Sequence, residues 1–236
     1  MKTAFAALKF LTFVGRFDRN QVNPQRVSAA IPFFPLVGIF LGFILVLLNR
    51  LLDPRLESEI LGALLIGVLA LLTGGIHYQG LQNTFDALPV KPGRGEEIGR
   101  SHVFGVLAIV FVVLLKVRAV EVTGETRSLG LLLTPLFARW SLVIFLYGAA
   151  SVSEGTARIL TDSVRAWHLV LTTVVTLAIA GFLVGRTSLW IGLYLSLFAL
   201  LSRSYLRRRN DYIDSDNFGA VIELSETLSF VLFASL

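Results

Sequence analysis

Long apolar segments recur along this chain, and they constrain its fold more than any other feature. A helix needs about 20 mainly apolar residues to cross a bilayer. Only 16% of the 236 residues are charged, against about 25% in ordinary soluble domains. The sequence therefore predicts an all-α integral membrane protein, a bundle of about seven transmembrane helices in a single polytopic membrane domain (residues 1–236). The expected spans are Ser28–Leu48, Ile60–Gly75, Val103–Leu115, Leu129–Ala149, Leu169–Val184, Leu189–Leu201 and Phe218–Leu236.

The N-terminal segment, residues 2–17, carries an amphipathic pattern. Phe5, Leu8, Leu11 and Thr12 fall on one helical face. A helix of this kind lies in the membrane interface, so we expect an N-terminal interfacial helix in contact with the lipid bilayer. A helix buried against the bundle would show the same pattern, and this alternative stays open.

Basic residues are divided unequally between the two ends of the expected spans. With a cytoplasmic N-terminus, 14 Lys and Arg lie on the cytoplasmic side and six, Lys116 among them, lie on the other. Cytoplasmic loops are enriched in bases, so we expect a multi-pass protein of the cell (plasma or inner) membrane, with its N-terminus and its polar loops in the cytoplasm. The net charge of +5 follows from the same rule, and no nucleic-acid partner is expected.

A polar stretch follows the second expected span and begins with His77. If it is helical, Gln79, Asn83 and Asp86 are spaced four and three residues apart and share a face. Three oxygen-bearing side chains on one face can hold a hard cation such as Mg²⁺. Only Asp86 is charged, however, and a polar helix end with an amide-rich cap explains the same residues.

Two groups of acids come late in the chain. Asp211, Asp214 and Asp216 follow a basic run and can form a solvated loop or supply further metal ligands. Glu223 and Glu226 fall inside the last apolar segment, where an ionisable residue is costly and marks a functional candidate by default. They are three residues apart, so both can face a polar bundle interior, and a pair near the membrane surface is the alternative.

Arg139 lies inside the fourth expected span. A buried guanidinium suits either an anionic phosphate or a structural carboxylate partner, and the sequence pattern does not separate the two. The chain has no cysteine, which excludes disulfides and thiolate metal sites.

Short motifs occur in a fixed order along most of the chain: Phe10-Leu11-Thr12, Phe33–Gly38, Gly74–His77, Thr84–Leu88, Arg100–Ala108, Arg139-Trp140 and Gly219–Glu226. Each motif is weak alone, but the ordered set resembles the cobalamin synthase family, the adenosylcobinamide-GDP ribazoletransferases. The resemblance implies a multi-span membrane enzyme of the last steps of cobalamin (vitamin B12) biosynthesis. Such an enzyme joins α-ribazole, or its 5′-phosphate, to adenosylcobinamide-GDP, releases GMP and requires Mg²⁺.

The resemblance also implies roles for individual residues. The residues expected to act in the reaction are His77, Asp86 and Arg139, with Arg139 paired to a phosphate or to Glu223. The expected Mg²⁺ ligands are Gln79, Asn83, Asp86, Asp216 and Glu223. The expected substrate contacts are Arg100, Ser101, His102 and Glu154.

The chain departs from the family pattern at several of these positions. The family histidine is followed by three aspartates, which are matched here by Gln79, Asn83 and Asp86. Three interpretations therefore stay open. They are a Mg²⁺-dependent phosphodiester-forming transferase, a catalytically impaired relative that serves as a corrinoid-binding or scaffold subunit, and a small transporter. The sequence does not predict an oligomeric state, and a homo-oligomer is compatible with it.

Overall fold

The computed structural model describes residues 7, 11–12, 28–88, 102–149, 156–210 and 213–236. Within these ranges all regular elements are helices, namely η2 (Ile31–Phe33), α3 (Phe34–Leu52), α4 (Ser58–Leu72), α5 (Ile76–Ala87), α6 (Val103–Val122), η3 (Gly124–Thr126), α7 (Arg127–Leu146), α8 (Thr156–Ser163), α9 (Ala166–Val184), α10 (Thr187–Asn210) and α11 (Ser215–Ala234). Six of the described spans are long and apolar enough to cross a membrane, and the bent pair α4–α5 makes a seventh if it counts as one span. The predicted all-α membrane bundle is confirmed.

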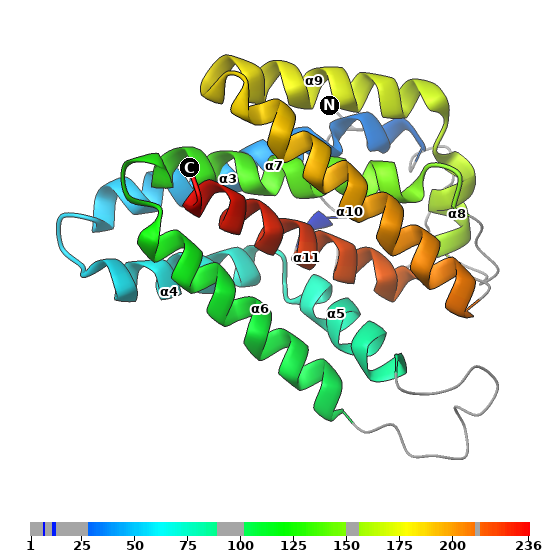
Figure 1. Cartoon of the computed structure of the whole chain (residues 1–236), viewed down its shortest axis with the longest axis horizontal. Coiled ribbons are helices and arrows are strands. Elements are labelled where there is room, and N and C mark those ends of the chain that lie inside the picture. Colours follow the sequence, from blue (N-terminus) through cyan, green and yellow to red (C-terminus); the bar gives the residue numbers. More distant parts are fainter. Residues whose placement is uncertain (1–6, 8–10, 13–27, 89–101, 150–155, 211–212) are drawn as a thin grey trace.

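Two helices, α7 and α11, form the interior of the bundle. In the most apolar stretch of each span, 89% of the residues are buried in the span that contains α7 and 72% in the span that contains α11. In each of the other single-helix spans, less than half of this stretch is buried. Helices α3, α9 and α10 pack against α7, while α5 and α6 pack against α11 (Figure 1). The outer helices expose large apolar side chains such as Phe43, Phe111 and Phe182. Soluble proteins rarely expose so much apolar surface, so this surface fits contact with lipid.

Helices α3 and α7 cross at very close range because α3 carries two glycines one turn apart. A methyl group on Gly38 would lie 2.2 Å from the carbonyl oxygen of Pro135, and one on Gly42 would lie 2.3 Å from that of Leu132. Small residues at this four-residue spacing let the backbones of membrane helices touch. The pair thus sets the distance between the first span and the central helix.

The chain turns sharply between α4 and α5. Gly74 and Gly75 have φ angles of 65° and 67°, a left-handed conformation that costs glycine little. The two helices are bent by 91° relative to each other, and α5 packs against α6 and α11 (Figure 1). The second expected span therefore ends at Leu72, and the polar stretch beginning near His77 forms a separate short helix.

Helices α6 and α10 are longer than predicted. α6 continues to Val122 instead of ending at Leu115, so the placement of Lys116 in an external loop was wrong. α10 likewise runs to Asn210, and the basic residues from Arg203 onward lie in its final turns. In both cases ionisable residues end the apolar run before the helix itself ends.

The structure describes three residues of the N-terminal segment, Ala7, Leu11 and Thr12. All three are buried, and Ala7 and Leu11 belong to the main hydrophobic core. These positions therefore follow the buried alternative rather than an exposed interfacial one. The other residues of the expected N-terminal helix lie outside the described ranges.

Candidate functional site

Helices α5 and α11 touch through their backbones. A methyl group on Gly80 would lie 2.5 Å from the carbonyl oxygen of Asp216, and one on Gly219 would lie 3.1 Å from the Cα atom of Gly80. Such contacts leave no room for side chains at the crossing itself. The polar side chains of the two helices are therefore held beside the crossing, within reach of one another.

Two side-chain hydrogen bonds join α5 to α11 at this junction. The Asn83 amide donates from Nδ2 to Oδ2 of Asp216 at 3.1 Å, and the Asn217 amide donates from Nδ2 to Oγ1 of Thr84, also at 3.1 Å. Asn217 further exchanges hydrogen bonds with Asp214 in a capping box that begins α11. The sequence-predicted residues Asn83 and Asp216 are thus brought together, although 133 residues separate them.

Asp86, at the end of α5, reaches the start of α6. Its Oδ1 accepts the backbone N–H of Gly105 at 2.7 Å, and its Oδ2 lies 3.2 Å from Nδ1 of His102. His102 is the N-cap of α6 but makes no side-chain cap there. The buried carboxylate therefore satisfies one of the free N–H groups that every helix start leaves open, and it does so from a neighbouring helix.

The His102 side chain is 70% exposed, while its Asp86 partner is only 3% exposed. A neutral imidazole that donates from Nδ1 to a carboxylate carries its lone pair on Nε2. Asp86 therefore fixes the ring so that Nε2 is available as a proton acceptor on the open side of the pair.

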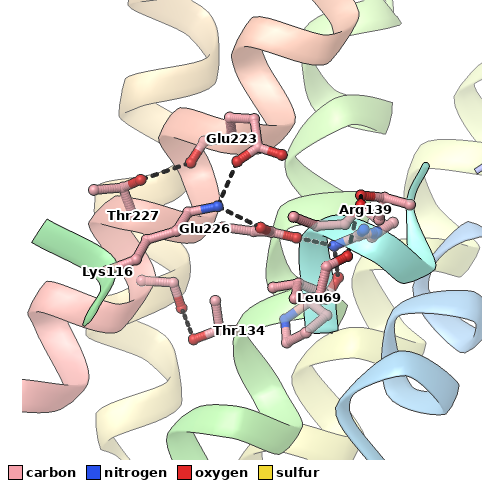
Figure 2. Close-up of polar contacts among 11 residues, drawn as sticks. Leu69, Lys116, Thr134, Arg139, Glu223, Glu226 and Thr227 are labelled. Atoms are coloured by element: carbon pink, nitrogen blue, oxygen red, sulfur yellow. Dashed lines mark hydrogen bonds and ion pairs between the residues drawn. The ribbon is translucent and has the colours of Figure 1, made fainter. Parts of the chain in front are cut away.

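A second group of polar residues, here called the charged cluster, lies inside the bundle and consists of Lys116, Arg139, Glu223 and Glu226. The Lys116 ammonium lies 2.5 Å from Oε2 of Glu223 and 2.6 Å from Oε2 of Glu226. Arg139 donates from Nη1 to the other oxygen of Glu226 (Figure 2). Each of the four residues is at most 1% exposed. Two cations and two anions from α6, α7 and α11 thus balance in an interior that penalises any unpaired charge.

The charged cluster also contacts α5. The Tyr78 ring centroid lies 5.4 Å from the Lys116 ammonium. His77, one residue earlier, is also buried. The cluster therefore anchors the start of α5, while the Asn83–Asp216 and Asp86–Gly105 hydrogen bonds anchor its end.

Comparison with known proteins identifies the family. The chain matches the family model for cobalamin-5-phosphate synthase over residues 3–234. It is a member of the cobalamin-5-phosphate synthase family. An adenosylcobinamide-GDP ribazoletransferase of Acinetobacter baumannii is 32% identical to it, with 99% of this chain and 97% of the relative aligned. Enzymes of that name from Geotalea daltonii and Caldanaerobacter subterraneus are 26% and 27% identical, each over the whole of this chain and 98% or 99% of their own length. No solved structure matches.

In this family member, Arg139 pairs with Glu226 and not with Glu223, which was one of its two expected partners. The carboxylate that accepts from Arg139 belongs to Glu226, while Glu223 bonds to Lys116. Glu223 also lies seven residues beyond Asp216 on α11, which is about 10 Å along a helix axis. The two were expected to share one Mg²⁺, whose ligands lie about 2.1 Å from the ion, and this spacing separates them.

Four of the five predicted Mg²⁺ ligands already have other partners in this chain. Asp86 accepts from Gly105 and pairs with His102, and Asn83 turns its N–H, not its oxygen, toward Asp216. Gln79 is exposed on α5. Within the described ranges, no three or more His, Asp or Glu side chains lie close enough to hold one metal ion. As arranged here, the five predicted ligands do not fit a Mg²⁺ site.

Three of the expected substrate contacts, Arg100, Ser101 and Glu154, lie outside the described residues of this chain. The fourth, His102, pairs with Asp86 at the start of α6. Sequence reasoning missed Lys116 altogether. Its position four residues after the buried Val112 and four before the buried Val120 is the helical spacing that could have placed it on the inner face of α6.

Proposed function

We propose that this synthase is an adenosylcobinamide-GDP ribazoletransferase of the final steps of cobalamin biosynthesis. The observation that carries the proposal is the family match over residues 3–234, supported by relatives of that name aligned over nearly their full length. These relatives are transferases, which favours an enzyme over a corrinoid-binding subunit or a transporter. The substrates are adenosylcobinamide-GDP and α-ribazole or its 5′-phosphate.

The reaction is a phosphodiester transfer. A ribose hydroxyl attacks the phosphorus next to the cobinamide arm, the bond from that phosphorus to the GMP leaving group breaks, and the hydroxyl proton passes to a base. Transfers of this kind depend mainly on positioning and on stabilisation of the phosphate charge. The protein must therefore supply a proton acceptor and positive charge near the diphosphate.

Among the described residues, His102 suits the role of proton acceptor. Its ring is largely exposed and its Nδ1 is held by the buried Asp86 carboxylate, so Nε2 can take a proton from an approaching hydroxyl. A carboxylate that orients an imidazole in this way is a recurrent arrangement for general-base catalysis. In this proposal His102 is the base and Asp86 is a positioning residue.

The charged cluster is proposed to hold α5 in place and not to contact substrate. Arg139 and Glu226 are at most 1% exposed, and Glu226 lies 11 residues into α11, or about 16 Å from its first residue. The predicted role of Arg139 toward a substrate phosphate is therefore replaced by a structural one. We place the Asn83–Asp216 end of the bundle in the cytoplasm, as the distribution of bases predicts.

The test is an assay of GMP release and cobalamin formation by the purified protein with adenosylcobinamide-GDP and α-ribazole phosphate. A reaction without α-ribazole phosphate is the control, and a Mg²⁺ titration examines the predicted metal requirement. Turnover that needs both substrates supports the proposal. Binding of cobinamide without turnover would favour the corrinoid-binding subunit. The absence of both binding and turnover would overturn the assignment.

A further inference from the structure

We propose that the Asn83–Asp216 hydrogen bond joins α5 to α11 in place of a bound divalent cation. The native junction is then assembled without Mg²⁺, and a carboxylate at position 83 would make it depend on one. This inference goes beyond the proposed function and does not rest on it, because it concerns how two helices are held together and is measured by unfolding.

The first argument is the direction of the hydrogen bond. Asn83 presents an N–H donor to Asp216 at 3.1 Å, so the negative charge of the carboxylate is met by the positive end of the amide dipole. Hydrogen bonds to a charged group are stronger than bonds between neutral groups. The amide thus supplies a favourable partner for Asp216 where a metal ion would otherwise do so.

The second argument is that the helices cannot easily move apart or slide at this point. The Gly80–Gly219 contact sets the distance between the backbones of α5 and α11. The neighbouring bond between Asn217 and Thr84 is itself buried and runs in the opposite direction, from α11 to α5. A side chain placed at position 83 therefore faces Asp216 whatever its charge.

The third argument compares the native pair with two carboxylates in the same place. Two ionised carboxylates about 3 Å apart repel each other strongly and need a shared proton or a cation. Two oxygens bound at right angles to one Mg²⁺ at about 2.1 Å lie about 3 Å apart, close to the 3.1 Å of the Asn83–Asp216 pair. An acid at position 83 would thus meet Asp216 at a spacing that suits chelation.

The experiment compares thermal unfolding of the full chain in detergent, in EDTA and in millimolar Mg²⁺. The native protein is expected to melt at the same temperature in both solutions. Asn83→Asp is expected to melt several degrees lower than the native protein in EDTA and to recover most of the loss in Mg²⁺. Ca²⁺ in a parallel sample shows whether the effect needs the smaller ion.

Two control variants isolate the pair. Asn83→Asp combined with Asp216→Asn exchanges the two groups, restores an amide–carboxylate hydrogen bond and should abolish the Mg²⁺ effect. Asn83→Ala removes the bond without adding charge and should melt lower than the native protein, equally in both solutions. Both controls keep the Gly80–Gly219 contact unchanged.

Three results would overturn the proposal. The first is an Asn83→Asp protein that melts alike in EDTA and Mg²⁺, because two carboxylates would then be tolerated without a cation. The second is an Asn83→Asp protein that does not fold even when purified in Mg²⁺. The third is a native protein that Mg²⁺ stabilises together with an Asn83→Ala variant that Mg²⁺ does not stabilise, since Asn83 would then be a metal ligand. Loss of transferase activity bears on none of these outcomes.

Discussion

The Lys116 ammonium lies 2.6 Å from a carboxylate oxygen of Glu226, and neither residue is more than 1% exposed. The second oxygen of Glu226 accepts from Arg139. One carboxylate on α11 is therefore shared by two cations from two other helices, and it is the link that joins the two halves of the charged cluster.

Glu226→Gln is predicted to destabilise the protein strongly. It leaves two buried cations with a single anion, and breaking a buried ion pair costs about 3–5 kcal/mol. Glu223→Gln should cost less, because Arg139 keeps its own partner. Thermal unfolding in detergent measures both, with the exposed Glu59→Gln as a control expected within about 0.5 kcal/mol of the native protein. If Glu226→Gln melts like Glu59→Gln, the cluster does not stabilise the bundle.

Gly38→Ala is predicted to disturb the packing of α3 on α7. The added methyl group would meet the Pro135 carbonyl oxygen at 2.2 Å, and such overpacking costs about 1–3 kcal/mol or more. Gly67→Ala is the matched control, since its methyl group meets nothing within 4 Å and alanine favours a helix by about 1 kcal/mol over glycine. The two variants should shift the unfolding temperature in opposite directions, and equal shifts would contradict the close-contact argument.

His102→Ala is predicted to lower kcat for GMP release by about 10²–10⁴-fold, the usual contribution of a general base. Asp86→Asn should also lower kcat. Its amide can still accept from the Gly105 N–H, but its own N–H would face Nδ1 of His102 and move the ring proton to Nε2. The unfolding temperature of Asp86→Asn should stay close to that of the native protein.

A pH–rate profile separates this role from a structural one. Loss of the acidic limb of the profile in His102→Ala supports a base at position 102. The exposed Arg158→Ala serves as the activity control. An unchanged profile and an unchanged kcat in His102→Ala would remove His102 from the mechanism.

The predicted orientation can be tested by single-cysteine labelling, because the chain has no cysteine of its own. Glu125→Cys and Arg208→Cys place one thiol at each end of the bundle, at exposed positions. A membrane-impermeant maleimide added to intact cells, with any outer membrane permeabilised first, should label Glu125→Cys. It should label Arg208→Cys only after the cell membrane is opened, and the reverse pattern would contradict a cytoplasmic N-terminus.

The sequence predicts the helices of this bundle well and their partners poorly. Apolar runs are local signals, so the spans follow from them. Lys116 was placed in a loop because a charge ended the apolar run, although it continues the inner face of α6. Likewise, the choice between Glu223 and Glu226 as the partner of Arg139 depends on the rotation of α11, which sequence spacing does not provide.

At the candidate site too, the sequence indicates residues but not their partners. The family resemblance indicated Asn83, Asp86 and Asp216 as Mg²⁺ ligands, whereas in the structure Asn83 bonds to Asp216 and Asp86 bonds to Gly105 and His102. The Asn83–Asp216 bond joins residues 133 positions apart, and the capping of α6 by Asp86 depends on where the end of α5 meets the next helix. Both require the 91° turn after α4, which two adjacent glycines permit but do not by themselves specify.

The sharing of acids and bases among helices has a consequence for how the protein is made. Lys116 precedes Glu223 by 107 residues, and Arg139 precedes Glu226 by 87. At about 5–20 residues per second, the ribosome delivers both cations to the membrane several seconds before either acid. A lone Lys or Arg at the centre of a span costs about 2.5–3.5 kcal/mol on insertion scales. Arrival of α11 therefore completes the insertion of α6 and α7, and a nascent chain stalled before this helix would hold them in a weakly inserted state.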